Sequence, residues 1–323
     1  MLFCLGLKAD GEQEQGSQGV PKALHLCKDW FQDTRVILCA GGARLERDQP
    51  CITYGMRGLI CLEVSVQGPD GDLHSGQDGG LFNEPLSDLV KILSSLSNTD
   101  GTIRVPGFYD NVTLPDEREK QQLACMSCCL DTYKKSSGLH HIRPKSSAEL
   151  LRRRWLQPSC TINTVETSEN GWSVIPKLAS AKVSLRIVPH QDANKVIDAF
   201  TKHLEEEFAK LQSPGNSVAV TVVHNKEWWI SDPCDKFYAC MANSVEKVWG
   251  CRPQFIRDGR TTPVIPYLQR TLSATAIHIP ICQENDNAHR GNESLAREDI
   301  IRGKEVIKHF LMSWHDSKMG CCA

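Results

Sequence analysis

The sequence of 323 residues has no excess of one charge and no long apolar run. Its 37 Lys and Arg side chains are balanced by 39 Asp and Glu side chains, which gives a formal net charge of -2. Proteins that bind nucleic acid by neutralising many phosphates need a basic excess, so the composition gives no case for that class. No apolar run reaches the roughly 20 residues of a membrane-spanning helix. We therefore expect a globular protein with neither a nucleic-acid nor a membrane partner.

The fifteen cysteines do not form a disulfide framework in our interpretation. Their number is odd, they are scattered, and dense frameworks belong to short secreted chains. Residues 1–7 are apolar, but no basic residues precede them and no cleavage pattern follows, so we predict a buried strand rather than a signal peptide. These features together predict a cytoplasmic protein with reduced cysteines.

The apolar pattern predicts an α/β fold with an inserted α+β segment. The first 40 residues are typical of an α/β sheet: strand 1–8, a polar loop, helix 20–30 and strand 34–40. The expected insert contains strands 59–66, 181–188 and 218–223 with helices 85–96 and 194–211. Helix 235–249, strand 274–281 and helix 295–312 follow it. Residues 115–150 predict a helix and an exposed loop, which carries Lys134-Lys135 and His140-His141.

Polar residues follow several of the predicted strands, where α/β enzymes keep their sites. The loop Glu12-Gln13-Glu14-Gln15-Gly16-Ser17 is one such segment, and His289 lies just after strand 274–281. His74 lies in a glycine-rich turn, where a ligand can approach the backbone closely. For each feature alone, a solvated turn or a surface histidine is the alternative.

Two further features point to anions or metals. The loop Asp258-Gly259-Arg260-Thr261-Thr262-Pro263 offers hydroxyl and backbone N–H groups to a carboxylate, and so does Arg186 on the polar side of its strand. A strand arginine on a solvated face is the alternative. The pair Cys125 and Cys128 has the spacing of zinc ligands but no second pair, so we do not expect a zinc ribbon there.

Several short motifs occur in an order that resembles the M20 metallopeptidases, nearest to the branch of the carnosine and cytosolic non-specific dipeptidases. The motifs are Pro50-Cys51-Ile52-Thr53-Tyr54-Gly55-Met56-Arg57-Gly58, Gly71-Asp72-Leu73-His74-Ser75-Gly76, Ser173-Val174-Ile175-Pro176, Arg186-Ile187-Val188-Pro189, Thr261-Thr262-Pro263 and Asp286-Asn287-Ala288-His289. The segment 163–176 lacks the glycine-rich stretch of the dipeptidases and is more similar to the fungal glutathione-degradation subunit built on the same fold.

The resemblance implies two domains. An α/β catalytic domain of the zinc-peptidase type would comprise 1–54 and 226–323, truncated at its N-terminus. A ferredoxin-like lid at 55–225 would mediate dimerisation. In the family, two zinc ions activate a water, a glutamate accepts its proton, and lid residues bind the substrate.

The resemblance assigns metal-ligand positions to Glu14 and His289. The general-base position falls on Gln13, whose amide cannot accept that proton, and Gly41 stands where a later carboxylate ligand belongs. The substrate-binding positions fall on His74, Ser173, Arg186 and Thr261, of which His74 also reaches the reacting group. Arg260 replaces a glycine usual in its loop. The family's His-x-Asp motif and bridging aspartate precede the Glu-Glu loop, and we expect neither in this chain.

These observations predict an M20-type hydrolase of dipeptides or short peptides that has little or no activity as this chain alone. Two of roughly five metal ligands stand at matched positions, and catalytic zinc takes three protein ligands. Two alternatives stay open: a non-catalytic subunit that forms a homodimer or a heterodimer with an M20 relative through the lid, and a subunit of a glutathione-degrading amidase complex.

Overall fold

The computed structural model describes residue 17 and residues 19–126, 130–288 and 291–319. Contacts divide the chain into two compact units: unit 1 comprises 1–56, 114–156 and 228–323, and unit 2 comprises 57–113 and 157–227. The sequence predicts that all of 55–225 belongs to the lid. The contacts instead group 114–156 with unit 1. No helix of the described chain has the length and apolarity that crossing a membrane requires.

Unit 1 is built on a mixed sheet with the strand order β1 (Val36–Ala40), β11 (Thr275–Ile279), β2 (Cys51–Met56) and β10 (Gln254–Asp258). β1 runs parallel to β11, and β10 runs parallel to β2, whereas β11 and β2 are antiparallel. The short strand β9 (Trp229–Ile230) pairs with β2. All six residues of β2 are buried, as expected of a strand covered on both faces.

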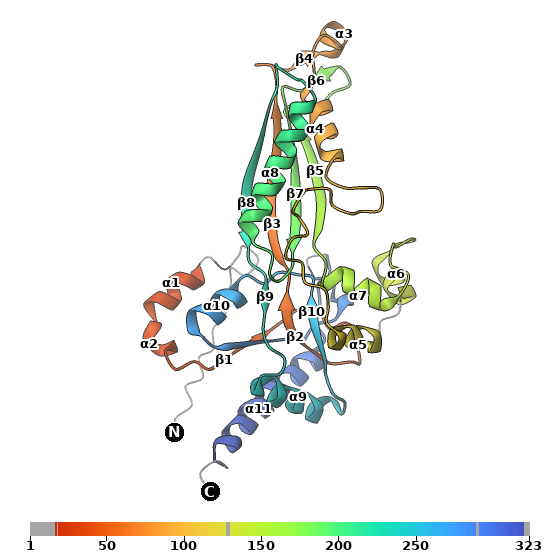
Figure 1. Ribbon diagram of the computed structural model, residues 1–323. Coiled ribbons are helices and arrows are strands. Elements are labelled where there is room, and N and C mark those ends of the chain that lie inside the picture. The colour runs from red at the N-terminus through yellow and green to blue at the C-terminus, as the bar shows by residue number, and fades with distance from the viewer. Residues whose placement is uncertain (1–16, 18, 127–129, 289–290, 320–323) are drawn as a thin grey trace. The chain divides into compact units, whose positions relative to one another are not determined.

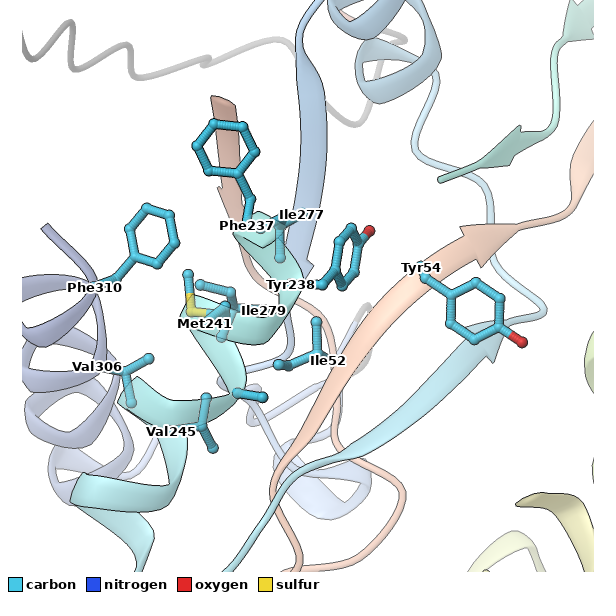
Figure 2. Packing of buried hydrophobic residues seen from close by; sticks show 11 residues of the cluster. Ile52, Tyr54, Phe237, Tyr238, Met241, Val245, Ile277, Ile279, Val306 and Phe310 are labelled. Carbon is cyan, nitrogen blue, oxygen red and sulfur yellow. The ribbon is translucent and has the colours of Figure 1, made fainter. Parts of the chain in front are cut away.

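One face of this sheet packs against α9 (Lys236–Trp249) and α11 (Arg297–Met319). Figure 2 shows Ile52 and Ile277 of the sheet directed toward Met241 of α9, with Phe310 of α11 close by. Burying an apolar side chain of this size stabilises the folded state by about 1.5–3 kcal/mol. The helix pair therefore anchors the sheet. α9 ends at Gly250, which takes the left-handed conformation (φ 74°) typical of a glycine cap.

Other helices cover the opposite face in two patches. α10 (Val264–Leu272) packs on β1 and β11 through the buried Ile265. α5 (Glu117–Cys125) and α7 (Ser147–Trp155) pack over Cys51 and Ile256. The remaining helices of unit 1 are α1 (Gly19–Leu26), α2 (Lys28–Phe31) and α6 (Leu130–Ser137). Between these two patches, the polar residues Thr53 and His278 lie in the middle of the sheet, and Asp258 lies at its end.

Unit 2 is the expected ferredoxin-like fold. Its antiparallel sheet has the order β5 (Ser159–Thr167), β7 (Leu178–Ile187), β3 (Gly58–Gln67) and β8 (Ser217–Lys226). α4 (Pro85–Ser94) and α8 (Ala193–Lys210) pack on one face. Alternate residues of β3 and β7 are buried beneath them, which is the period-2 pattern of a half-covered sheet. At one end, β4 (Leu73–His74), α3 (Ser75–Asp78) and β6 (Val174–Ile175) form a small tip (Figure 1).

The α/β class is confirmed, and most of the elements predicted from 34 onward are confirmed to within a few residues. The last helix runs on to Met319 instead of ending at 312, and residues 115–150, predicted as one helix and a loop, contain α5, α6 and the start of α7. The single helix expected at 20–30 is two short helices, α1 and α2, which are separated at Cys27. The strand expected at 1–8 lies outside the described residues. The sequence also missed β5, because the paired strand at 159–167 carries mostly exposed side chains and lacks clean apolar alternation.

Candidate functional site

Three of the predicted site residues, Gln13, Glu14 and His289, lie outside the described residues, so their assignments stay predictions. The other four are described. His74, Ser173 and Arg186 belong to unit 2, and Thr261 belongs to unit 1.

The tip of unit 2 brings His74 and Ser173 together. The backbone N–H of Ser75 donates to the carbonyl oxygen of Ser173 over 2.9 Å, and His74 pairs with Val174 across β4 and β6. The ring Nδ1 of His74 accepts a hydrogen bond from the backbone N–H of Gly76 at 3.1 Å. In the neutral ring the proton therefore sits on Nε2. His74 is exposed, so this N–H is a donor that the tip presents to a ligand.

Arg186 lies at the other end of the same sheet. It pairs with Leu59 and Ser159, whereas Leu178, eight residues before it on β7, pairs with Gln67 beside the tip. At about 3.3 Å per residue, Arg186 is roughly 25 Å along the strand from the tip. A dipeptide spans only about 7 Å. Within one unit 2, Arg186 and His74 therefore cannot hold the same dipeptide.

In unit 1, the loop that leads to Thr261 carries an ion pair that the sequence did not predict. The guanidinium of Arg260 donates from Nε to both carboxylate oxygens of Asp258, at 3.1 and 3.0 Å, and the backbone N–H of Arg260 adds a bond of 2.9 Å. Burial alone raises the pKa of Asp258, but the hydrogen bonds and charge of Arg260 outweigh it and hold that pKa below its ordinary value. Asp258 is thus ionised, and Arg260 occupies both of its carboxylate oxygens.

Gly42 makes room for this arginine. A Cβ atom at Gly42 would lie 3.2 Å from Nη2 of Arg260 and 3.2 Å from Cε1 of His278, and the φ of 73° is strained for other residues. Nη2 of Arg260 also donates to the carbonyl oxygen of Ala43 at 3.3 Å. The guanidinium therefore packs against the backbone that follows β1, next to Gly41.

His278 lies in the middle of the sheet face, opposite Cys39 of β1 and Thr53 of β2. Burial lowers the pKa of its imidazole from 6.5 to about 4, against the opposing charge of Asp258. Its Nδ1 and the hydroxyl of Thr53 are buried and have no hydrogen-bond partner within the described residues. Burial also raises the pKa of the Cys39 thiol to about 11. At neutral pH this row is uncharged.

A second ion pair extends the network. Nη2 of Arg154 in α7 donates to Glu284 over 2.8 Å, and the guanidinium of Arg154 lies 4.9 Å from the ring centroid of Tyr133. Farther along, Arg44 and Asp299 form a buried pair at 2.8 Å. The carboxylates near the sheet end are therefore held by cations of the same chain.

Sequence reasoning missed His278, although a signal was present. The alternation in strand 274–281 places Ala274, Ala276 and His278 on one face, so an imidazole stands out in an apolar row. No such signal in the sequence predicts that Thr53 lies opposite His278 or that Gly42 leaves space for Arg260. The first depends on the register of two strands and the second on the fold of a loop.

The described residues do not fit a two-metal site. They contain no group of three or more His, Cys, Asp or Glu side chains placed to hold a metal ion. Asp258, Glu284 and Asp299 are engaged by arginines, and the carboxylate of Asp286 accepts from the backbone N–H of Gln283 at 2.7 Å. Gly41 offers no side chain at the expected carboxylate position. We therefore derive no catalytic step through a metal from these residues.

The expectation that the chain contains no His-x-Asp motif is wrong. His190-Gln191-Asp192 has this pattern, but it lies in unit 2 at the start of α8. The Asp192 carboxylate caps that helix by accepting from the backbone N–H groups of Asn194 and Lys195, and the amide of Gln191 donates to the carbonyl of Phe108 at 2.6 Å. This triplet starts a helix.

Comparison with known proteins finds a peptidase dimerisation domain and several dipeptidases. The family model M20_dimer, a peptidase dimerisation domain, matches residues 54–212. The chain is 29% identical over 306 residues to the Cys-Gly metallodipeptidase DUG1 of Candida albicans, which covers 94% of this chain and 63% of that protein. It is 32% identical over 307 residues to the human Beta-Ala-His dipeptidase, which covers 94% and 60%.

The structure resembles that of the dipeptidase Dug1p from Saccharomyces cerevisiae with a TM-score of 0.85 at 28% identity, which covers 93% of this chain and 64% of that one. The chain thus spans less than two thirds of the length of these relatives.

The buried imidazole predicts a specific dependence of stability on pH. Because the pKa of His278 is about 4 when folded and near 6.5 when unfolded, the unfolded state binds more protons between these values. Stability is then complete above pH 6.5 and falls as the pH drops toward 4. Between pH 7 and pH 5 this single group removes about 2 kcal/mol from the free energy of unfolding.

Urea unfolding at both pH values measures the effect. We expect His278→Gln to lose most of this pH-dependent difference, while the matched control His25→Gln, at an exposed position of α1, keeps it. Equal pH dependence in the wild type and His278→Gln would contradict the assignment.

Proposed function

Because the chain belongs to the M20 peptidase family, we propose that its protein acts in the hydrolysis of dipeptides and that this chain alone has little or no such activity. Relatives that match nearly all of the chain are named for hydrolysis of Cys-Gly and β-Ala-His, which supports the substrate class. The observation that carries the proposed impairment is the occupation of the carboxylates in unit 1 by arginines of the same chain.

Zinc is the ion that we propose for a complete site of this kind, because imidazole and carboxylate groups suit it. Glu14 and His289 would supply one ligand each. A catalytic zinc takes three protein ligands, so the proposed set is too small. Gln13 adds a second deficit, because its amide does not take up a proton in the neutral range.

The residues of this chain keep a part in substrate binding in our proposal. The Nε2–H of His74 and the hydroxyl of Ser173 are donors at one end of unit 2 and suit the oxygen of a scissile amide. Arg186 and Thr261 suit a carboxylate. Since Arg186 and the tip lie roughly 25 Å apart along β7, we propose that His74 serves the site of another subunit.

A second role, that of a non-catalytic partner, is favoured by one edge of unit 2. Among the described residues, β5 pairs only with β7, and its other edge is open. Ile162 and Val165 stand opposite the buried Val183 and Ala181, yet 44% and 47% of them are exposed. α8 packs on β8, whereas α4 packs on β7 and β3. An open apolar edge strand is a template for pairing with a second chain, which we propose as the dimer contact.

The activity of the isolated chain tests the first proposal. With Cys-Gly or β-Ala-His as substrate and added zinc or manganese, we expect turnover at background. Gln13→Glu is expected to leave it there, because one restored carboxylate does not supply the missing ligands. The human dipeptidase assayed in parallel is the positive control. Turnover near that of the control, or strong rescue by the single substitution, would contradict the proposal.

Substitutions on the two edge strands test the second proposal. Ile162→Lys with Val165→Lys places charge on the open edge of β5, and we expect sedimentation velocity to show a shift from dimer to monomer. The matched control, Val222→Lys with Val223→Lys on β8, is at similarly exposed positions and is expected to leave the dimer intact. Dissociation by the β8 pair alone would refute pairing through β5.

A further inference from the structure

The face of the unit 2 sheet that α4 and α8 leave open has a group of basic side chains at one end. In β3 and β7, buried residues beneath the two helices alternate with residues that face the other way. The strand register places the second set in two rows. These eight positions, here called the open-face patch, are Ser159, Arg186, Leu59 and Lys226 in the first row and Thr161, Ser184, Cys61 and His224 in the second.

None of the eight positions of the open-face patch carries a carboxylate. Its basic side chains are those of Arg186, Lys226 and His224. Burial raises the pKa of the Cys61 thiol, and the charge of Arg186 offsets only part of this rise, so the thiol is neutral at pH 7. Arg57 adds a cation beside the first row, where its Nη1 donates to Oγ of Ser159 at 3.4 Å. The patch is therefore positive in a chain whose net charge is -2.

The charge changes farther along the same face of the sheet. In the next row, Glu63 stands opposite Lys182, and Lys182 also forms an ion pair of 2.7 Å with Glu166. Two carboxylates thus share one lysine there. The positive charge is confined to the end of the sheet that holds Arg186. At about 3.3 Å per residue, the two rows of the patch span roughly 7 Å along the strands, which is the size of a small ligand rather than of a nucleic acid.

Arg186 and Lys226 flank the central strand β3 on opposite sides, because both stand opposite Leu59. Neighbouring strands lie about 4.8 Å apart, so the backbones that carry the two cations are about 10 Å apart. Residues directly opposite each other on antiparallel strands face the same side, and both side chains are long enough to reach one ligand over Leu59. The exposed His224 lies two residues from Lys226 on the same side of β8. A small ligand that meets all three groups needs more than one anionic group.

We propose that the open-face patch selects dipeptides whose C-terminal residue is Glu or Asp. Arg186 holds the α-carboxylate, and Lys226 with His224 holds the side-chain carboxylate. This inference rests on the proposed function, which assigns Arg186 to a substrate carboxylate, and it adds Lys226 and His224 as specificity-determining residues. Hydrogen bonds between an ionised donor and a carboxylate are stronger than those to a neutral amide, so the patch distinguishes an acidic side chain from an amide of the same shape.

Chemical-shift titration of the full chain by NMR at low salt, with Ala-Glu and with Ala-Gln, compares two peptides of one shape that differ by one charge. We expect the Kd of Ala-Glu to be lower by about fivefold. Lys226→Met is expected to bring the two Kd values within about twofold of each other, because the ammonium is lost. The matched control Lys182→Met, at a lysine of the same face that Glu166 engages, keeps the preference. Unchanged amide spectra of the free variants show that they fold.

The imidazole of His224 reports where the peptide binds. Its Cε1–H signal is identified as the one that His224→Gln removes. We expect this signal to shift when Ala-Glu is added to the wild-type chain, while the signal of the exposed His25 in α1 stays in place. Binding of Ala-Glu without a shift at His224 would overturn the assignment.

A further variant, Arg186→Met, separates this inference from the proposed function. If Ala-Glu and Ala-Gln bind equally and Arg186→Met weakens both, the role of Arg186 stands and the selection is wrong. If neither peptide binds, both are wrong. A preference for Ala-Glu that survives Lys226→Met also overturns the inference. So does inorganic phosphate that binds as tightly as Ala-Glu, because the patch would then hold any small anion.

Discussion

The bidentate ion pair between Arg260 and Asp258 is the interaction on which the account of unit 1 depends. It places a fixed cation of the chain against the backbone after β1, in the space that Gly42 leaves open. Asp258 is buried, and a buried charge is costly unless its hydrogen bonds are satisfied; Arg260 satisfies them, although 49% of its own side chain stays exposed. The same pattern recurs at Arg154 with Glu284 and at Arg44 with Asp299. A carboxylate neutralised in this way is a poor metal ligand, because a metal would have to displace a bound guanidinium.

In unit 2, the constraint is the distance along the sheet between its two ends. Its sheet separates Arg186 from the tip by several times the size of a dipeptide. Groups placed so far apart on one rigid sheet act on one small substrate only if another subunit brings a site to each of them. In our proposal, the region that matches the M20 dimerisation domain, residues 54–212, therefore serves function as well as assembly.

Much of the fold could be predicted from the sequence, because burial in strands and helices leaves a periodic pattern. The alternation in 181–188 predicted β7, and Gly250 marked the end of α9. The edge strand β5 was missed because its exposed side chains break that alternation. The grouping of 114–156 with unit 1 was also missed, since domain membership depends on contacts between distant segments such as α5 and α7 over Ile256. For the site, local motifs identified the tip with His74 and Ser173, but the contact of Arg260 with Gly42 joins residues more than 200 positions apart, and no local pattern predicts it.

The central claim is that too few donors are available in this chain to hold a pair of divalent ions. Metal content measured by inductively coupled plasma mass spectrometry, on protein purified without chelators and then extensively dialysed, tests it most directly. The account predicts less than one retained zinc, manganese or cobalt atom per chain. Two retained atoms per chain would contradict it.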